Sequence, residues 1–417
     1  MSMPCLRRGF GRQAPTCLPK PRRRQELDKK GRFSKISKFE NKQLCVCYYG
    51  SYDLNEPHNT TYLAGLKEVG IQVNEIHLLP LRERDEAGKY ASIPSVVTVI
   101  FGFVINSISL FFRLLKTRNI DAVIVGYPGY FDLPPAKIFS VIKRIPVIFN
   151  IHISLYETLV IDRQYYKKKS VIAGFIKWYD KLTIHLSDTV IVDTRSHGVF
   201  FSKLYDVPAE KFQRVFIGAD PIFKPTAPVA HNTVKVLFYG TFIPLQGIDY
   251  IVRAADLLRD EPCLKFEIIG RGQTREKILR LANQLRIDNI DFIEWVNRYE
   301  LVQRIADADI CLGGQFGLTP KADLVIGYKC YQMMACGKAI IVSDSRGNLE
   351  LLTHGNDCYM CKAGDVHDLA EAILTLKNDS VMREKLAAAS RQTFTTKSST
   401  AQIGNDLYSI IAMAIER

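Results

Sequence analysis

From residue 44 onward, short apolar runs alternate with longer segments whose apolar residues recur at helical spacing. Such runs are typical of buried strands. In the first half of the chain they lie at Leu44–Tyr49, Ile71–His77, Asp121–Gly126, Pro146–His152, Thr189–Asp193 and Arg214–Ile217. In the second half they lie at Lys235–Tyr239, Lys265–Ile269, Ile290–Trp295, Asp309–Leu312 and Lys338–Ser343. Strands that alternate with crossover helices form parallel sheets covered on both faces, so the pattern predicts two α/β domains in tandem.

A proline-rich stretch without a regular pattern, 223–232, separates the two series. Proline and irregular spacing are typical of linkers. We therefore expect a first domain at 44–224, a linker at 225–232 and a second domain at 233–400. The last segment, 401–417, is expected to form a C-terminal helix that packs back on the first domain.

The chain has 417 residues and a formal net charge of +13. Most of this charge lies in residues 1–43, which contain 13 basic and three acidic residues. Several prolines and few large apolar residues are typical of a disordered tail. A basic tail can lie on an anionic membrane, bind nucleic acid without specificity, or simply be solvated. It lacks the apolar segment of a secretory signal. We expect a cytoplasmic protein with no specific nucleic-acid partner.

Ten cysteines are scattered along the chain, and only Cys358 and Cys361 form a CxxC pair. No second pair or histidine cluster accompanies them, as a zinc site would require. We therefore expect reduced, structural thiols and no metal cofactor.

One segment, Ala91–Phe112, contains no charged residue. Its length and composition meet the threshold for a membrane-spanning helix. It lies, however, between two expected strands of one sheet, and a spanning helix would put those strands on opposite sides of a bilayer. One interpretation is therefore a crossover helix buried on the sheet. The other is peripheral membrane contact through 91–118, where Arg113, Lys116 and Arg118 flank the apolar side chains.

Two loops of the second domain have the pattern of anion-binding turns. The segment Phe238–Asp249 runs from a strand through a loop with Gly240 and Gly247 into a helix. Backbone N–H groups at such a turn suit a diphosphate. The segment Phe266–Gly272 also ends a strand in glycines and places Arg271 at the carboxyl edge of the sheet, where doubly wound folds bind ligands. Ordinary strand-to-helix turns also contain glycines, so neither loop is specific by itself.

The segment 317–341 is more specific. It leads through a helix ending Met334-Ala335-Cys336-Gly337 into an apolar strand, and an acidic residue, Glu350, precedes the next helix. This order resembles family 4 of the retaining GT-B glycosyltransferases, whose pattern runs through "FG…EAMACGKPVI". The resemblance covers about residues 44–400. It implies a GT-B fold, in which two Rossmann-like domains face each other across a cleft. It also implies hexosyl transfer, with retention, from a nucleotide-diphosphate sugar to a glycan or lipid-linked acceptor in glycan or polysaccharide biosynthesis.

The chain departs from the family pattern at charged positions. Two glutamates usual in the family fall on Leu324 and Gln332, and the usual Arg and Lys of the first loop fall on Thr241 and Gln246. Three other cations, Lys321, Lys329 and Arg271, are available as replacements. The resemblance implies donor binding by the following residues: Gly240, Thr241, Gln246, Gly247, Arg271, Lys321, Gly327, Lys329 and Gln332. Gln332 can still hydrogen-bond a ribose hydroxyl, without the strength of a carboxylate.

In the first domain, the loop after the first strand resembles the family's acceptor loop. Its candidate acceptor-side residues are Gly50, Asp53 and His58, although polar residues here also serve as helix caps. His152 closes a predicted strand, and the resemblance implies that it hydrogen-bonds the transferred sugar as a catalytic residue. A histidine satisfied at a strand end is the alternative interpretation.

Two other functions remain open. A GT-B-fold sugar-nucleotide 2-epimerase shares the architecture but needs carboxylates in the cleft, which the sequence does not identify. A non-catalytic GT-B-fold binding protein would explain the missing glutamates. For the transferase, the expected partners are a nucleotide-sugar donor as substrate and a glycan or lipid-linked acceptor, with peripheral contact at the cytoplasmic face of a membrane.

Overall fold

The computed structural model describes residues 43–54, 56–78 and 96–417. The basic tail predicted at 1–43, except for its last residue, lies outside the described residues, as do residues 91–95 of the uncharged segment.

The first sheet contains six parallel strands. They are β1 (Cys45–Gly50), β2 (Gln72–His77), β3 (Ala122–Val125), β4 (Val147–Asn150), β5 (Thr189–Val192) and β6 (Phe212–Arg214). Their order across the sheet is β2-β1-β3-β4-β5-β6. The central strands are fully buried, as expected for a parallel sheet with helices on both faces.

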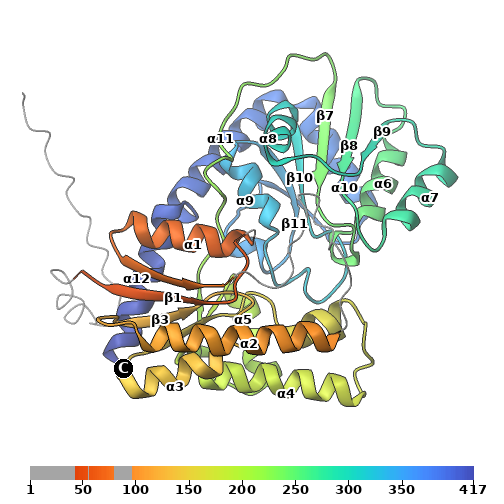
Figure 1. Cartoon of the computed structure of the whole chain (residues 1–417). Coiled ribbons are helices and arrows are strands. Elements are labelled where there is room, and N and C mark those ends of the chain that lie inside the picture. Colours follow the sequence, from red (N-terminus) through yellow and green to blue (C-terminus); the bar gives the residue numbers. More distant parts are fainter. Residues whose placement is uncertain (1–42, 55, 79–95) are drawn as a thin grey trace, which may run out of the picture. The chain divides into compact units, whose positions relative to one another are not determined.

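Helices cover both faces of this sheet (Figure 1). One face carries α1 (Pro57–Glu68) and the C-terminal helix α12 (Thr400–Glu416), which pack on each other through a close approach of Gly65 and Gly404. The other face carries α2 (Val96–Leu115), α3 (Leu133–Lys143), α4 (Val171–Leu186) and α5 (Arg195–Tyr205). A short π-helix, η2 (Glu157–Asp162), lies between β4 and α4.

The second sheet also contains six parallel strands. They are β7 (Val234–Tyr239), β8 (Leu264–Ile269), β9 (Ile290–Ile293), β10 (Ile310–Gly314), β11 (Ala339–Ser343) and β12 (Tyr359–Cys361), in the order β12-β11-β10-β7-β8-β9. One core contains side chains of α6 (Ile248–Leu257), α7 (Arg275–Leu285) and α10 (Val366–Asn378). The other contains side chains of α8 (Arg298–Asp307) and α9 (Tyr328–Ala335), together with Phe394 of α11 (Ser380–Lys397). Residues 223–231, between the two sheets in the chain, form neither helix nor strand.

Several strands begin or end a few residues from the predicted bounds, and two strands differ more from the sequence prediction. The strand expected at Arg214–Ile217 ends at Arg214, because side chains of α1 take the following carbonyl groups. Thr61 donates its hydroxyl to the carbonyl of Ile217 at 2.6 Å, and Tyr62 donates to that of Val215 at 2.9 Å. The edge strand β12 was not predicted, since three residues carry too little pattern.

The uncharged segment forms a crossover helix with one side on the sheet. Leu110 and Leu114 of α2 are fully buried in the core of the first sheet. Ser107 donates to the carboxylate of Asp132 at 2.5 Å, while Ile108 and Phe112 are exposed. Within the described ranges, no helix has the length and apolarity needed to cross a membrane.

Candidate functional site

The order in which strands are added to the second sheet reverses between β7 and β10. Connections from β7 lead toward β8 and β9, whereas those from β10 lead toward β11 and β12. In doubly wound sheets, ligands bind at the carboxyl ends of the strands at such a switch point. Here those ends are Gly240, directly after β7, and Gly314, the last residue of β10.

Lys329, in the first turn of α9, places its ammonium group between these two strand ends. A Cβ atom at Gly240 would lie 3.3 Å from Nζ, and one at Gly314 would lie 3.0 Å from it. Both glycines also have positive φ angles, +147° and +79°. A side chain at either position would therefore crowd the end of the lysine and strain the backbone.

The ammonium group of Lys329 is buried, with 6% of the residue exposed. It donates a hydrogen bond to Oε1 of Gln246 and lies 4.7 Å from the ring centroid of Phe238. Burial lowers the pKa of Lys329 to about 8. Among the residues that the structure describes, no carboxylate forms an ion pair with it. A buried cation without an anionic partner is costly, and a bound anion would offset that cost.

A second cation lies at the same edge of the sheet. Arg271 follows β8, and its Nη2 atom is buried without a hydrogen-bond partner in the described part of the chain. Its carbonyl accepts a hydrogen bond from the backbone N–H of Phe242 at 2.8 Å, which ties this turn to the loop after β7. An unsatisfied guanidinium nitrogen is a donor available to an acceptor such as a phosphate oxygen.

The loop after β7 packs closely on the loop after β10. Gly247 has a φ angle of +63° and approaches the backbone nitrogen of Gly317 so closely that a Cβ atom would lie 2.5 Å from it. The carbonyl of Gln246 accepts from the N–H of Phe316 at 3.3 Å. These contacts hold Gln246 against Lys329, while Thr241 is exposed on the same loop.

The helix α9 brings Gly327 and Gln332 to the same region. Gly327 precedes α9 as its N-cap. The Oε1 atom of Gln332, which is buried, accepts a hydrogen bond from the hydroxyl of Tyr239 at 2.9 Å. Leu324, which stands where the resembled pattern has its first glutamate, is buried, and its carbonyl accepts from the hydroxyl of Thr194.

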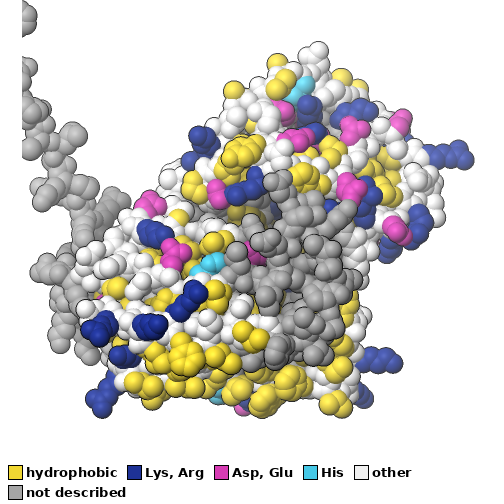
Figure 2. Space-filling model, in the orientation of Figure 1, with side chains coloured by type: hydrophobic (Ala, Val, Ile, Leu, Met, Phe, Trp, Pro, Cys, Tyr) yellow, Lys and Arg dark blue, Asp and Glu magenta, His cyan; other side chains and the backbone are white. Residues whose placement is uncertain are grey.

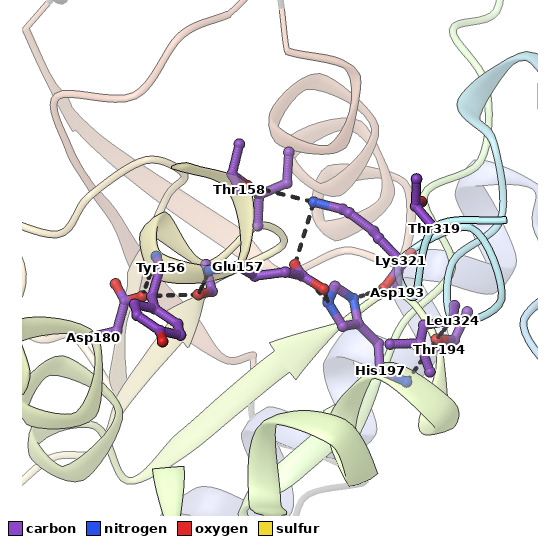
Figure 3. A network of polar contacts seen from close by, with 12 residues as sticks. Tyr156, Glu157, Thr158, Asp180, Asp193, Thr194, His197, Thr319, Lys321 and Leu324 are labelled. Atoms are coloured by element: carbon purple, nitrogen blue, oxygen red, sulfur yellow. Dashed lines mark hydrogen bonds and ion pairs between the residues drawn. The ribbon is translucent and has the colours of Figure 1, made fainter. Parts of the chain in front are cut away.

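Lys321 contacts the first half of the chain rather than the switch point. Its Nζ lies 3.3 Å from a carboxylate oxygen of Glu157 in η2, and 3.5 Å from the hydroxyl of Thr158 (Figure 3). Glu157 also lies 3.1 Å from Nε2 of His197, whose Nδ1 lies 2.8 Å from Asp193. The result is a buried chain of alternating charges, which we call the ionic bridge: Asp193, His197, Glu157 and Lys321.

The charges in the ionic bridge support one another. Burial disfavours an imidazolium, but Glu157 and Asp193 outweigh it and raise the pKa of His197 to about 9. Burial likewise opposes the carboxylate of Glu157, but His197 and Lys321 lower its pKa to about 2. At neutral pH, therefore, His197 is charged and Glu157 is ionised.

His152 and His58 lie together at the carboxyl edge of the first sheet. Their rings stack with centroids 4.1 Å apart, and the ring of Tyr127 meets both edge-on. Burial lowers the pKa of His152 to about 4, and burial together with His152 lowers the pKa of His58 well below its usual value. Both rings are neutral at pH 7. Nε2 of His58 is buried and has no hydrogen-bond partner among the residues described.

The other acceptor-side candidates lie at the end of β1 and in the loop that leads from it to α1, whose first turn contains His58. Gly50 ends β1 with a φ angle of +127°, and the carboxylate of Asp132 lies 3.0 Å from where its Cβ would be. Asp132 accepts from the N–H of Ser51 at 2.7 Å. The carbonyl of Asp53 accepts from the side chain of Asn59 at 2.9 Å, which fixes the loop above α1.

The sequence analysis missed Glu157 and His197. Glu157 belongs to a π-helix, which has no recognisable pattern in a single sequence. His197 carried a signal, because it follows the strand-end residue Asp193 by four positions at the start of a predicted helix. Polar residues that follow a buried parallel strand in this way commonly lie at the ligand-binding edge.

The second half of the chain is similar to known glycosyltransferases. Residues 221–393 match the family model described as "Glycosyl transferases group 1". The chain is 27% identical over 188 residues to the lipopolysaccharide core biosynthesis glycosyltransferase LpsD of Rhizobium meliloti, covering 43% of this chain and 52% of LpsD. It is 20% identical over 225 residues to the poly(ribitol-phosphate) alpha-N-acetylglucosaminyltransferase of Staphylococcus aureus, covering 51% of this chain and 42% of that protein. The chain thus spans about half the length of these relatives.

Solved structures share the fold over most of the chain. HepE of Anabaena in complex with UDP superposes with a TM-score of 0.62 and 15% identity, covering 89% of this chain and all of HepE. Sucrose-phosphate synthase of Thermosynechococcus elongatus superposes with a TM-score of 0.65 and 15% identity, covering 90% of this chain and all of the synthase. At such low identity, the likeness establishes the architecture.

Proposed function

We propose that this chain is a group 1 glycosyltransferase that transfers a sugar from a nucleotide-diphosphate sugar to a glycan or lipid-linked acceptor. The match of residues 221–393 to that family model and the GT-B fold support the proposal. The observation that carries the proposal is the buried ammonium group of Lys329, which lies at the switch point of the second sheet without a carboxylate partner among the described residues. A diphosphate bound there would supply the missing negative charge.

The leaving group of such a donor is a nucleoside diphosphate, which gains negative charge as the sugar departs. Oriented cations at that position stabilise the transition state. Lys329 lies in the first turn of α9, where the helix dipole adds to the positive potential. Arg271 offers a buried, unsatisfied N–H donor at the same sheet edge. These two residues would take the roles of the Arg and Lys that the first loop lacks.

On the acceptor side, His152 and His58 would position sugar hydroxyl groups. A neutral imidazole donates one hydrogen bond and accepts one, so it orients hydroxyls without adding charge near the reacting carbon. Nε2 of His58 is free among the described residues to make such a bond.

We propose that transfer proceeds with retention, by departure and attack on the same face of the sugar. The state of Glu157 supports a route without a covalent carboxylate intermediate. Glu157 is held between His197 and Lys321 with a pKa of about 2, which makes it a weak base and a weak nucleophile.

The same observation weakens the epimerase alternative. An epimerase removes and returns a proton on carbon, and an efficient base for that step has a pKa near the working pH. Glu157, the buried carboxylate that pairs with Lys321, has a pKa far below neutrality and is therefore poorly suited to that step.

The relatives guide the choice of substrates. LpsD is named for lipopolysaccharide core biosynthesis, and the staphylococcal relative is named for transfer to poly(ribitol-phosphate). The structure of HepE contains UDP. We therefore propose a role in glycan or polysaccharide biosynthesis, with UDP-sugars as the first donors to examine and a working location at the cytoplasmic face of a membrane.

The decisive experiment removes the charge of Lys329 and keeps its volume. Calorimetry with UDP, GDP and dTDP should show that Lys329→Met weakens binding by ~1.5–3 kcal/mol, the scale of a hydrogen bond to a charged group. The matched control is Lys377→Met, which removes another largely buried lysine, on α10, that pairs with Glu261. The control should bind the nucleotide as the parent protein does.

Unchanged nucleotide affinity in a folded Lys329→Met variant would remove Lys329 from the donor site. If the parent protein keeps its fold but neither binds a nucleotide nor hydrolyses or transfers from any nucleotide sugar, the non-catalytic alternative is correct.

A further inference from the structure

Exposed apolar side chains gather on three neighbouring helices of the first half of the chain. Eleven large apolar residues of α2, α3 and α4 are more than a third exposed, and Val171, at the start of α4, is 90% exposed. In the orientation shared by Figures 1 and 2, these helices run side by side, and apolar side chains are gathered along them. We call this surface the apolar face; it consists of Ile105, Ile108, Phe112, Leu115, Ile138, Val141, Ile142, Val171, Ile172, Phe175 and Trp178.

Aromatic contacts make the surface continuous. Phe103 of α2 stacks on Phe131 at 5.7 Å between centroids, and Phe131 contacts Tyr179 of α4 at 5.6 Å. Tyr179 in turn stacks on Phe175 at 6.2 Å. Monomeric proteins rarely leave so many contiguous apolar side chains in water, so a surface of this kind marks an interaction site.

Most of the charged residues on and beside these helices are basic, and the exposed carboxylate of Asp188, after α4, is paired with Lys137 of α3 at 2.7 Å. The three helices contain a single acidic residue, Asp180, which is buried and accepts hydrogen bonds from Ser154, Tyr156 and Tyr205. Basic residues stand at the helix ends instead: Arg113, Lys116 and Arg118 at α2, Lys143 and Arg144 at α3, and Lys167, Lys168 and Lys169 before α4. A hollow of about 390 Å³ at the end of α2 is lined by Arg113, Lys116 and Arg118 on one side and by Glu75 of β2 among its other residues, so basic groups outnumber acidic ones there.

These cations frame the surface at both ends. Crossover helices run antiparallel to the strands of a parallel sheet, so α2 and α3 end at its amino edge and α4 begins at its carboxyl edge. The basic groups therefore lie at opposite ends of the apolar face. A surface that offers apolar groups beneath a layer of anionic groups would complement both the apolar side chains and the cations.

We propose that the apolar face docks on an anionic lipid bilayer, with the axes of α2, α3 and α4 along the membrane plane. The apolar side chains enter the boundary between headgroups and acyl chains, and the basic residues contact lipid phosphates. Trp178 and Tyr179 are of the type that settles at this boundary. A second copy of the chain fits less well, because a two-fold contact would bring like charges together.

The apolar face does not depend on the donor site, but its position has a consequence for the acceptor. Helix α4 begins at the carboxyl edge of the first sheet, the edge at which His152 and Glu157 follow β4. Docking through α4 would bring this edge close to an acceptor held in the membrane.

The test uses the full chain and measures its partition onto vesicles of phosphatidylglycerol and phosphatidylcholine by co-sedimentation. The double variant Phe175→Ser with Trp178→Ser should bind at least about tenfold more weakly than the parent. Replacing Lys167, Lys168 and Lys169 by Gln should also cost at least about tenfold, and should reduce the preference over vesicles of phosphatidylcholine alone. The matched control, Tyr299→Ser with Val381→Ser, removes residues that are 79% and 76% exposed on α8 and α11, and should bind like the parent.

Residues 1–42 are the same in all these proteins. If both sets of variants bind vesicles as tightly as the parent, another part of the chain carries the membrane contact and the proposal is wrong. A dimer in light scattering that the Phe175 and Trp178 changes dissociate would show that a second copy occupies the face. Nucleotide affinity, measured on the same variants, should stay unchanged, which separates failure at this surface from failure of the donor site.

Discussion

Changing Glu157 to Gln should lower the thermal stability of the protein and weaken its dependence on pH. Glu157 is the only member of the ionic bridge that touches both cations, His197 at 3.1 Å and Lys321 at 3.3 Å. The amide keeps the shape of the side chain and removes its charge. His197 is then left with Asp193 alone, and Lys321 loses its carboxylate partner.

The size of the effect follows from burial. Removing one partner of a buried ion pair costs ~3–5 kcal/mol, because the other charge remains out of water. If residues 43–417 unfold together, an unfolding entropy of ~2.1 cal/mol/K per residue converts this cost to a decrease in Tm of roughly 4–6 °C.

The dependence on pH identifies the cause. Glu157 and Asp193 raise the pKa of His197 from 6.5 in the unfolded chain to about 9. A raised pKa means that the stabilisation is fully present below pH 6.5 and is lost as the pH rises through 9. The difference between parent and variant should therefore be largest near pH 6.5 and shrink by up to ~3 kcal/mol by pH 9.5. Lys329, whose pKa is lowered, contributes with the opposite sign, but it does so equally in both proteins.

The assay is thermal unfolding at pH 6, 7, 8, 9 and about 9.5, the range over which His197 loses its proton. His367→Gln, which removes an exposed histidine of α10, is the control and should follow the parent at every pH. Parallel curves for the parent and Glu157→Gln would show that Glu157 does not hold the proton on His197, and the account of the ionic bridge would fail.

Two further predictions concern the donor site. Because the pKa of Lys329 is lowered to about 8, affinity for a nucleoside diphosphate should fall above pH 8 by up to about tenfold per pH unit, and calorimetry should find no such fall in Lys329→Met. Gln332→Glu should tighten binding of UDP by up to ~1 kcal/mol and bring no gain for dTDP, which lacks the 2′-hydroxyl. Equal effects on both nucleotides would mean that position 332 serves only Tyr239, whose hydroxyl it accepts at 2.9 Å, and does not contact the ribose.

The alternation of strands and helices could be predicted because it reflects burial. In a parallel sheet a central strand is covered on both faces, so β3 and β11 appear as continuous apolar runs. The pattern does not predict where a strand ends when a few side-chain contacts determine that end. The end of β6 depends on Thr61 and Tyr62, which bind carbonyls more than 150 positions away in the chain. A local pattern contains no information about such contacts.

The site, like the fold, contains residues whose contacts the sequence could predict and residues whose contacts it could not. Lys329 and Gln246 could be found because their loops have a recognisable order in the sequence, and the structure brings them into contact. Lys321 was chosen for the same loop, but its side chain turns to Glu157 in the first half of the chain. The direction of a long, flexible side chain depends on its partner, and the partner here belonged to a π-helix that the sequence did not predict.

The position of Lys321 gives a physical explanation for the first of the two missing glutamates, at position 324. Leu324 is buried, and its carbonyl accepts the hydroxyl of Thr194 from the first half of the chain. A carboxylate at 324 would lose its hydration at this contact and lie near the negative end of a backbone carbonyl, which is unfavourable. The loop instead carries a cation three positions earlier, and Glu157 supplies the carboxylate across the contact. The pair of Lys321 and Glu157 leaves no net charge at this contact.

Lys329 then remains as the buried cation without a carboxylate partner among the described residues of the switch point. A glutamate at position 324 would instead put the carboxylate on the same loop as Lys321. On this reasoning, Leu324 and Glu157 are two parts of one arrangement, and the absence of the glutamate from the loop is compatible with an active donor site.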